Sequence, residues 1–87
     1  MKSQKSEKTR LTRSELTAAL ARLYQQEQAE YHRLAELSQE MLLKGEAAAY
    51  AALDEQAQRQ NHVLIGVRRA AEAVGVSEGD LLAWKEA

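Results

Sequence analysis

Hydrophobic side chains recur at steps of three and four residues along two long stretches of this chain. The first stretch runs from Leu16 to Leu42 and the second from Tyr50 to Val74. This spacing puts apolar residues on one side of an α-helix, since a helix makes one turn in about 3.6 residues. The pattern predicts two amphipathic helices, residues 12–44 and residues 46–74, within one all-α domain of residues 11–87.

Start and stop signals set the ends of these helices. Thr12-Arg13-Ser14-Glu15 has the spacing of a capping box, in which Thr12 and Glu15 each bond the other's backbone amide. Gly45 and Gly75 follow the two stretches, where a left-handed glycine commonly ends a helix. Ser77 precedes two acidic residues and is a good N-cap. It predicts a short third helix over residues 78–86.

The second helix carries a regular heptad pattern. Its members are Tyr50, Leu53, Ala57, Gln60, Leu64, Val67, Ala71 and Val74. Such a repeat predicts coiled-coil-like packing against another long helix. Gln60 is its polar member, and Glu27 interrupts the seam of the first helix. Glu27 is either a buried polar group that fixes the register or a residue at the edge of the seam. Gly66 either lets another backbone approach closely or is a tolerated surface position.

Only one or two residues remain for the turn at Gly45. The two helices therefore fold back as an antiparallel hairpin or continue as one kinked rod. We expect the hairpin, because both apolar stripes need a surface to pack against.

Composition agrees with this architecture. The 87 residues include sixteen Ala and twelve Leu but no Pro, Phe or Cys. Val and Ile together number five, so residues that favour strands are scarce. Without cysteine the chain has neither a disulfide framework nor a thiolate metal site.

The charge balance selects no charged partner. Twelve basic and thirteen acidic residues give a net charge of −1. Residues 1–10 are basic, and we predict a disordered leader there; an arm for nucleic acid is the alternative. With this charge balance we expect no nucleic acid as a partner. We also expect no membrane partner and a cytoplasmic location, since no stretch has the length of a membrane span or of a signal-peptide core.

Candidate chemistry is sparse. His32 has Glu36 one turn away, but neither histidine follows the Glu-x-x-His spacing of di-metal bundles. No serine or threonine has a histidine and an acid at helical spacing, and there is no glycine-rich phosphate loop. We therefore predict a protein that is not an enzyme and that has no cofactor or metal.

The apolar surface exceeds what one hairpin consumes, so we predict association through helices, with a homodimeric helical bundle as the expected assembly. The predicted self-association residues are Leu20, Leu23, Tyr24, Tyr31, Leu34, Tyr50, Leu53 and Leu64. The apolar cluster near the C-terminus, around Trp84, either folds back on the hairpin or contacts a partner.

The arrangement resembles the flagellar export chaperones of the FlgN type over residues 11–84. It shares a long first helix with spaced leucines, the Gly45-Glu46 turn, the Ala48–Leu53 start of the second helix and the Arg68-Arg69 doublet. The resemblance implies a cytoplasmic chaperone that holds helical ends of hook-associated proteins, with the client contact toward the C-terminal part. The predicted partner-binding residues are Val67, Ala71, Val74, Leu81, Leu82 and Trp84.

The sequence thus predicts a non-enzymatic helix-binding protein, a small chaperone for flagellar or type III export clients. The alternative is a structural homodimeric four-helix bundle with a regulatory or scaffolding role.

Overall fold

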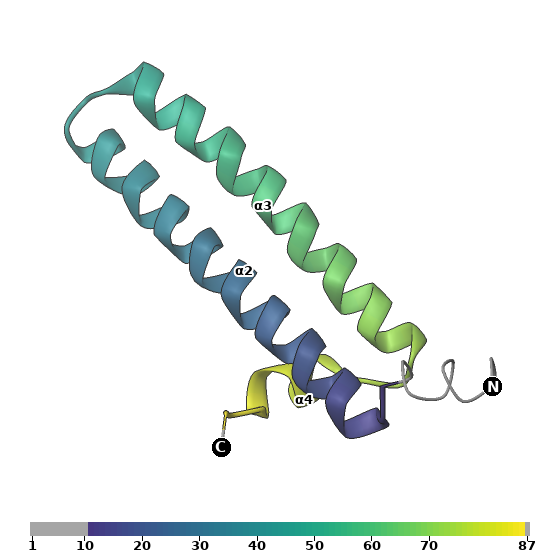
Figure 1. Ribbon diagram of the computed structural model, residues 1–87. Coiled ribbons are helices and arrows are strands. Elements are labelled where there is room, and N and C mark those ends of the chain that lie inside the picture. Colours follow the sequence, from purple (N-terminus) through teal and green to yellow (C-terminus); the bar gives the residue numbers. More distant parts are fainter. Residues whose placement is uncertain (1–10, 87) are drawn as a thin grey trace, which may run out of the picture.

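The computed structural model describes residues 11–86, which form a helical hairpin with a short third helix (Figure 1). Helix α2 spans Arg13–Leu43, α3 spans Ala47–Ala73 and α4 spans Glu78–Ala83. The predicted all-α antiparallel hairpin is confirmed. The third helix ends three residues earlier than expected, and the predicted basic leader lies outside the described residues.

The start of α2 is a complete capping box. The Glu15 amide donates to the Thr12 hydroxyl at 3.1 Å, and the Thr12 amide donates to Glu15 Oε1 at 3.0 Å. The hydrogen bond from the Thr12 amide holds the pKa of Glu15 below its ordinary value. Two donors that the first turn leaves free are thereby satisfied. The same arrangement recurs at α4, where Ser77 and Asp80 exchange bonds of 3.0 and 3.1 Å.

Both long helices end on a left-handed glycine. Gly45 has φ 74° and Gly75 has φ 81°, a region that costs other residues steric strain. The residue after each glycine donates back to the carbonyl three residues before the helix cap, as in a Schellman motif. After α3 this residue is Val76, whose side chain is almost fully buried. The motif therefore turns the chain sharply and starts its return toward α2.

The register of the hairpin is marked by a polar pair in the seam. Gln60 Nε2 donates to the Glu27 carbonyl at 2.9 Å and also to the Glu27 carboxylate. Both residues are half-buried, so the two polar interruptions of the heptads face each other. Glu27 is thus half-buried and hydrogen-bonded to Gln60 across the seam, and it also lines an open pocket on the surface of α2.

The hydrophobic core lies at the open end of the hairpin, where α4 packs, and the turn end is thinly packed. The main cluster consists of Ala21, Tyr24, Leu64, Ala71, Val76 and Leu81. Toward the turn, Leu34, Ser38 and Ala57 are buried between the long helices. Leu42 and Leu43 at the end of α2 are exposed.

Arg13 connects the start of α2 to the end of α3 at the open end of the hairpin. Its guanidinium donates to the carbonyl oxygens of Val74 at 3.3 Å and Gly75 at 2.6 Å. These carbonyls follow the last turn of α3, where a positive charge also opposes the negative end of the helix dipole. The first residue of α2 thus caps the end of α3.

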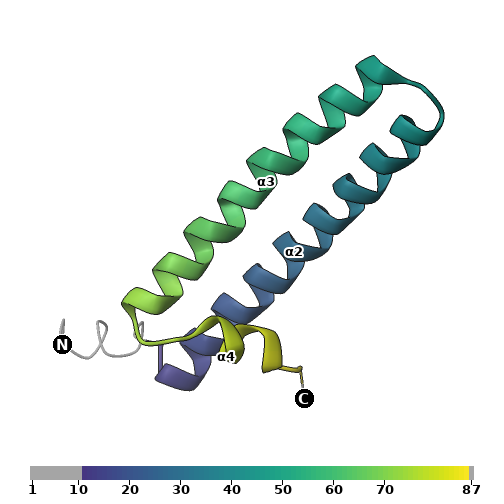
Figure 2. The same ribbon diagram turned by 180° about the vertical axis from the view of Figure 1, so that it is seen from behind.

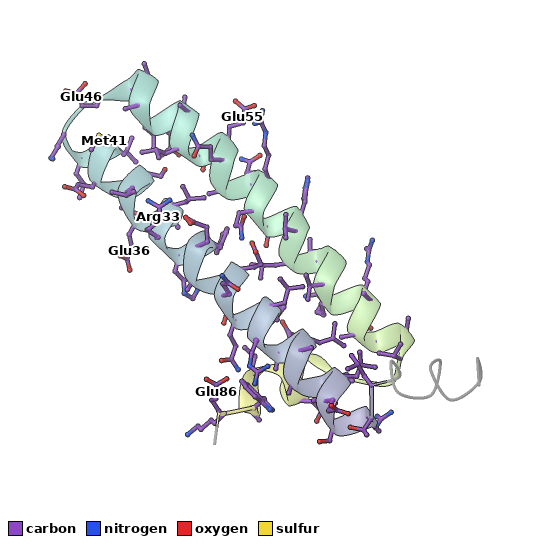
Figure 3. All side chains as sticks on the ribbon, in the orientation of Figure 1. Arg33, Glu36, Met41, Glu46, Glu55 and Glu86 are labelled. Atoms are coloured by element: carbon purple, nitrogen blue, oxygen red, sulfur yellow. The ribbon has the colours of Figure 1, made fainter. Side chains whose placement is uncertain are left out.

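Charged side chains cover the outer faces of both long helices. Figure 3 shows Glu36 pointing away from α3 and Glu55 pointing away from α2. Among the helices that the structure describes, none combines the length and the apolar character needed to cross a bilayer.

Candidate functional site

Helix α4 packs across one side of the hairpin formed by α2 and α3. It crosses α2 behind the hairpin in Figure 1 and in front of it in Figure 2. Leu81 is 0% exposed and joins the core cluster with Ala21 and Leu64. Burying a leucine side chain contributes about 1.5–3 kcal/mol, so this residue is the main apolar anchor of α4.

Polar side chains of α2 fix α4 in position. Gln25 Nε2 donates to the carbonyl oxygens of Leu81 at 2.8 Å and Trp84 at 2.9 Å. These acceptors lie at the C-terminal end of α4, where helical carbonyls lack partners. Gln25 therefore supplies a cap from another helix and orients α4 across α2.

The start of α4 is held by a buried phenol. Tyr24 is 4% exposed, and its hydroxyl donates to Glu78 Oε2 at 2.6 Å. Burial raises the pKa of Tyr24 above its ordinary value of 10.0, and the bond to Glu78 acts in the same direction. Arg68 of α3 lies 3.8 Å from the same carboxylate oxygen. Glu78 thus links all three helices.

The Trp84 ring, at the end of α4, lies against the guanidinium of Arg22. The Arg22 guanidinium lies 5.2 Å from the centre of the Trp84 ring, within the range of a cation–π contact. Arg22 Nε also donates to Glu86 at 2.7 Å. Of the two sequence alternatives for the C-terminal cluster, the described chain has the one in which it folds back on the hairpin.

A groove continues on the same side of the hairpin toward the turn. It has a volume of about 230 Å³. Its walls include Tyr31, Ala35, Ser38 and Leu42 of α2 and Tyr50, Asp54, Ala57 and Asn61 of α3. We call the side of the hairpin that carries α4 and this groove the α4 flank.

Helical spacing shows that α4 and the groove share one flank. Ala21 and Gln25 contact α4, and Ala35 and Gln39, which line the groove, lie fourteen residues further along α2. Fourteen residues are almost four full turns, so these pairs point in the same direction. On α3, Asp54 and Asn61 of the groove lie two heptads and one heptad before Arg68. Since Arg68 contacts Glu78 of α4, these residues lie on the α4 side of α3 as well.

The groove combines tyrosine rings, small side chains and polar groups. Tyr31 and Tyr50 are half-buried, so part of each ring faces the opening. Gln39, Asp54, Gln58 and Asn61 give the rim hydrogen-bonding groups. Tyrosines around a small-residue floor with a polar rim are typical of protein-binding sites.

The predicted partner-binding residues divide into three groups in the structure. Ala71 and Leu81 are 0% exposed and belong to the core cluster of the chain itself. Val67 and Trp84 are half-buried against that core. Only Val74 and Leu82, 44% and 47% exposed, remain open. The predicted C-terminal surface is thus mostly occupied by the chain's own packing.

The predicted self-association residues lie mainly between α2 and α3. Tyr24, Leu34 and Leu64 are buried in the seam. The half-buried members are Leu20, Tyr31, Tyr50 and Leu53. Leu23 alone of this set is exposed, at 42%, and it points to the side opposite α4. These heptad residues therefore hold the hairpin itself together, and Leu23 is left for contacts outside it.

Tyr24, Tyr31 and Tyr50 were predicted as self-association residues, but the sequence did not point to the polar residues that hold α4 or to Ser38 in the groove. Arg13 and Gln25 bind backbone carbonyls some sixty residues away, and no spacing pattern signals such a contact. Ser38 is buried in the seam among apolar positions. Its place one heptad after Tyr31 was the available signal.

Within residues 11–86, no three His, Asp or Glu side chains lie close enough to hold a metal ion. Comparisons with protein-family models, curated proteins and solved structures find no match to this chain.

Proposed function

We propose that this chain is a non-enzymatic helix-binding protein that takes an amphipathic helix of another protein into the open part of the α4 flank. The observation that carries the proposal is α4 itself. The flank already holds one short helix by a buried leucine and by capping bonds. The groove on the same flank has similar walls and is open.

The dimensions of the groove specify the partner. Its α2 wall runs from Tyr31 to Leu42, so a helix lying along it matches about three turns, roughly 16 Å. Such a helix would present small or apolar residues at positions i, i+3, i+4 and i+7 to the tyrosines. Polar residues beside this stripe would meet Gln39, Gln58 and Asn61 on the rim.

The resemblance to FlgN-type chaperones supports a choice of partner. In that family the clients are hook-associated proteins, which offer helical ends before export. On this proposal the chain is a cytoplasmic chaperone for flagellar or type III export clients. The groove then shields an apolar helix face that would otherwise associate with other chains.

The proposal is tested with a synthetic peptide copying the terminal amphipathic helix of a hook-associated protein. We expect the labelled peptide to bind the chain and to gain helicity, as measured by fluorescence anisotropy and circular dichroism. Leu42→Asp places a charge in the groove wall, and we expect it to weaken binding about tenfold or more. No saturable binding of the peptide to the wild-type chain would refute the export-client assignment.

Leu43→Asp is the matched control. Leu43 is the next residue, is 82% exposed and does not line the groove. We expect its substitution to leave the affinity for the peptide unchanged. Equal losses in both variants would show that the peptide binds elsewhere, and the proposed groove would have to be abandoned.

A further inference from the structure

The side of the hairpin opposite α4 carries a second apolar surface. Residues at one heptad position place Leu16, Leu23, Glu30 and Leu37 of α2 on this side, with Val63 and Ala70 of α3 beside the leucines. We call this surface the far flank. It is the side of the long helices that faces the reader in Figure 1. Since α4 lies behind the hairpin in that view, it does not cover the far flank.

Large apolar side chains on the far flank are open. Leu23 is 42% exposed and Val63 is 45% exposed. In an antiparallel hairpin with Glu27 opposite Gln60, these two residues lie side by side across the seam. They form the centre of an apolar patch that continues to Leu16 and Ala70 at the open end.

Gly66 lies at the edge of this patch, one turn from Val63 and Ala70. A glycine inside a helix costs about 1 kcal/mol relative to alanine. Nothing lies within 4 Å of the place where its Cβ would be, so packing inside the monomer does not require a glycine. A glycine at this position would be explained if the backbone of another chain packed against it.

Charges of both signs lie around the patch, and two pairs of them interact within the chain. Arg33 donates to Glu30 at 2.7 Å, and Lys44 lies 3.2 Å from Glu40. A surface of one sign would repel an identical copy, whereas a balanced surface does not.

The area of the far flank matches that of a stable dimer. The long helices have 31 and 27 residues, so they are at least about 40 Å long at 1.5 Å per residue. Two helices side by side are about 20 Å wide, which gives roughly 800 Å² for the whole flank, polar positions such as Glu30 and Gln56 included. A standard interface buries about 800 Å² on each partner.

We propose that the far flank binds a second copy of this chain, giving a two-fold symmetric four-helix bundle. Each copy contributes the same patch, centred on Leu23 and Val63, so the contact is self-complementary. The second copy also covers the exposed side of a hairpin whose own core is small. Both α4 flanks face outward in this dimer, and the groove of each copy stays accessible.

The proposal is tested by measuring the mass of the full chain in solution with light scattering and sedimentation across a dilution series. We expect twice the 9.7 kDa chain mass for the wild type. Val63→Glu and, separately, Leu23→Glu bury a charge in the proposed interface. We expect each to weaken self-association about 100-fold or more and to leave the helical circular dichroism unchanged.

Leu43→Glu is the matched control, because Leu43 is a more exposed leucine outside the patch. It should associate like the wild type. A wild-type chain that stays at the single-chain mass overturns the proposal. A folded Val63→Glu or Leu23→Glu chain that associates as tightly as the wild type overturns it as well. Neither result depends on peptide binding at the α4 flank, so the two proposals fail separately.

Discussion

At the scale of single residues, the polar pair in the seam shows what a heptad pattern can and cannot predict. The pattern identified Gln60 as a polar seam residue and Glu27 as a polar interruption of the other helix. Which residue faces which depends on the register, and the register depends on where the turn lies. The structure pairs Glu27 with Gln60, whereas a hairpin centred on Gly45 would have put Gln60 opposite position 30.

Removing the Gln60 amide tests the value of this pair. Gln60→Ala leaves the half-buried Glu27 carboxylate without its donor. We expect the free energy of unfolding to fall by about 1.5–3 kcal/mol, the usual contribution of a hydrogen bond to a charged group. The measurement is urea unfolding followed by circular dichroism. Gln58→Ala, which removes only a surface bond to Asp54, should change stability by less than about 0.5 kcal/mol.

Replacing both members of the pair separates stability from specificity. Glu27→Leu combined with Gln60→Leu makes the seam continuously apolar. We expect this double variant to be at least as stable as the wild type, because well-packed apolar residues often replace a buried polar pair without loss. A clear loss of stability in the double variant would contradict the view that the pair mainly sets the register.

At the scale of elements, the two long helices could be predicted and the position of α4 could not. Periodicity, a capping box and two glycines define α2 and α3 because these signals are local. The site of α4 on α2 depends on Gln25, Tyr24 and Arg22, whose partners lie more than fifty residues away. Local patterns carry no information on such contacts. The start signal at Ser77 therefore predicted that a helix follows but not where that helix packs.

Adjacent leucines in α4 provide a matched test of its docking. Leu81 is 0% exposed and Leu82 is 47% exposed. Leu81→Ala leaves a cavity under α4, and we expect it to lower the free energy of unfolding by about 2–4 kcal/mol. Leu82→Ala should lower it by about 0.5 kcal/mol. Urea unfolding followed by Trp84 fluorescence reports on both; similar losses in the two variants would mean that α4 is not anchored as described.

Acid should loosen α4 through its capping box. The Ser77 amide and hydroxyl hold the pKa of Asp80 below its ordinary value of 3.8. A carboxyl whose pKa is lower in the folded state stabilises the fold above its unfolded pKa, and this stabilisation is lost as pH falls through the folded value. We therefore expect the emission of Trp84, the single tryptophan, to shift to longer wavelength below about pH 3.8.

Asp80→Asn separates this titration from other acid effects. The amide does not titrate, so the variant should show a weaker dependence of Trp84 emission on pH in the same range. An unchanged acid transition in Asp80→Asn would assign the transition to other carboxyl groups.

At the scale of the whole molecule, the stability of the hairpin should be uneven along its length. The core cluster lies at the open end, where α4 packs on α2 and α3, and Leu81 and Val76 are its largest fully buried side chains. The turn end has few buried side chains, and Leu42 and Leu43 are exposed there. A hairpin of this kind opens from its thinly packed end, because less apolar surface has to be exposed there.

Amide hydrogen exchange measures this gradient directly. We expect the amides near Ala21–Tyr24 and Leu64–Ala71 to exchange at least about tenfold more slowly than those near the turn, since burying one leucine contributes about 1.5–3 kcal/mol. A peptide bound in the groove should slow exchange at the turn end most, where Leu42 and Tyr50 line the groove. Association through the far flank should instead protect amides near Leu23 and Val63, and Val63→Glu should remove that protection. Uniform exchange along both long helices would contradict the uneven core and would leave no reason to expect the turn end to respond first to a partner.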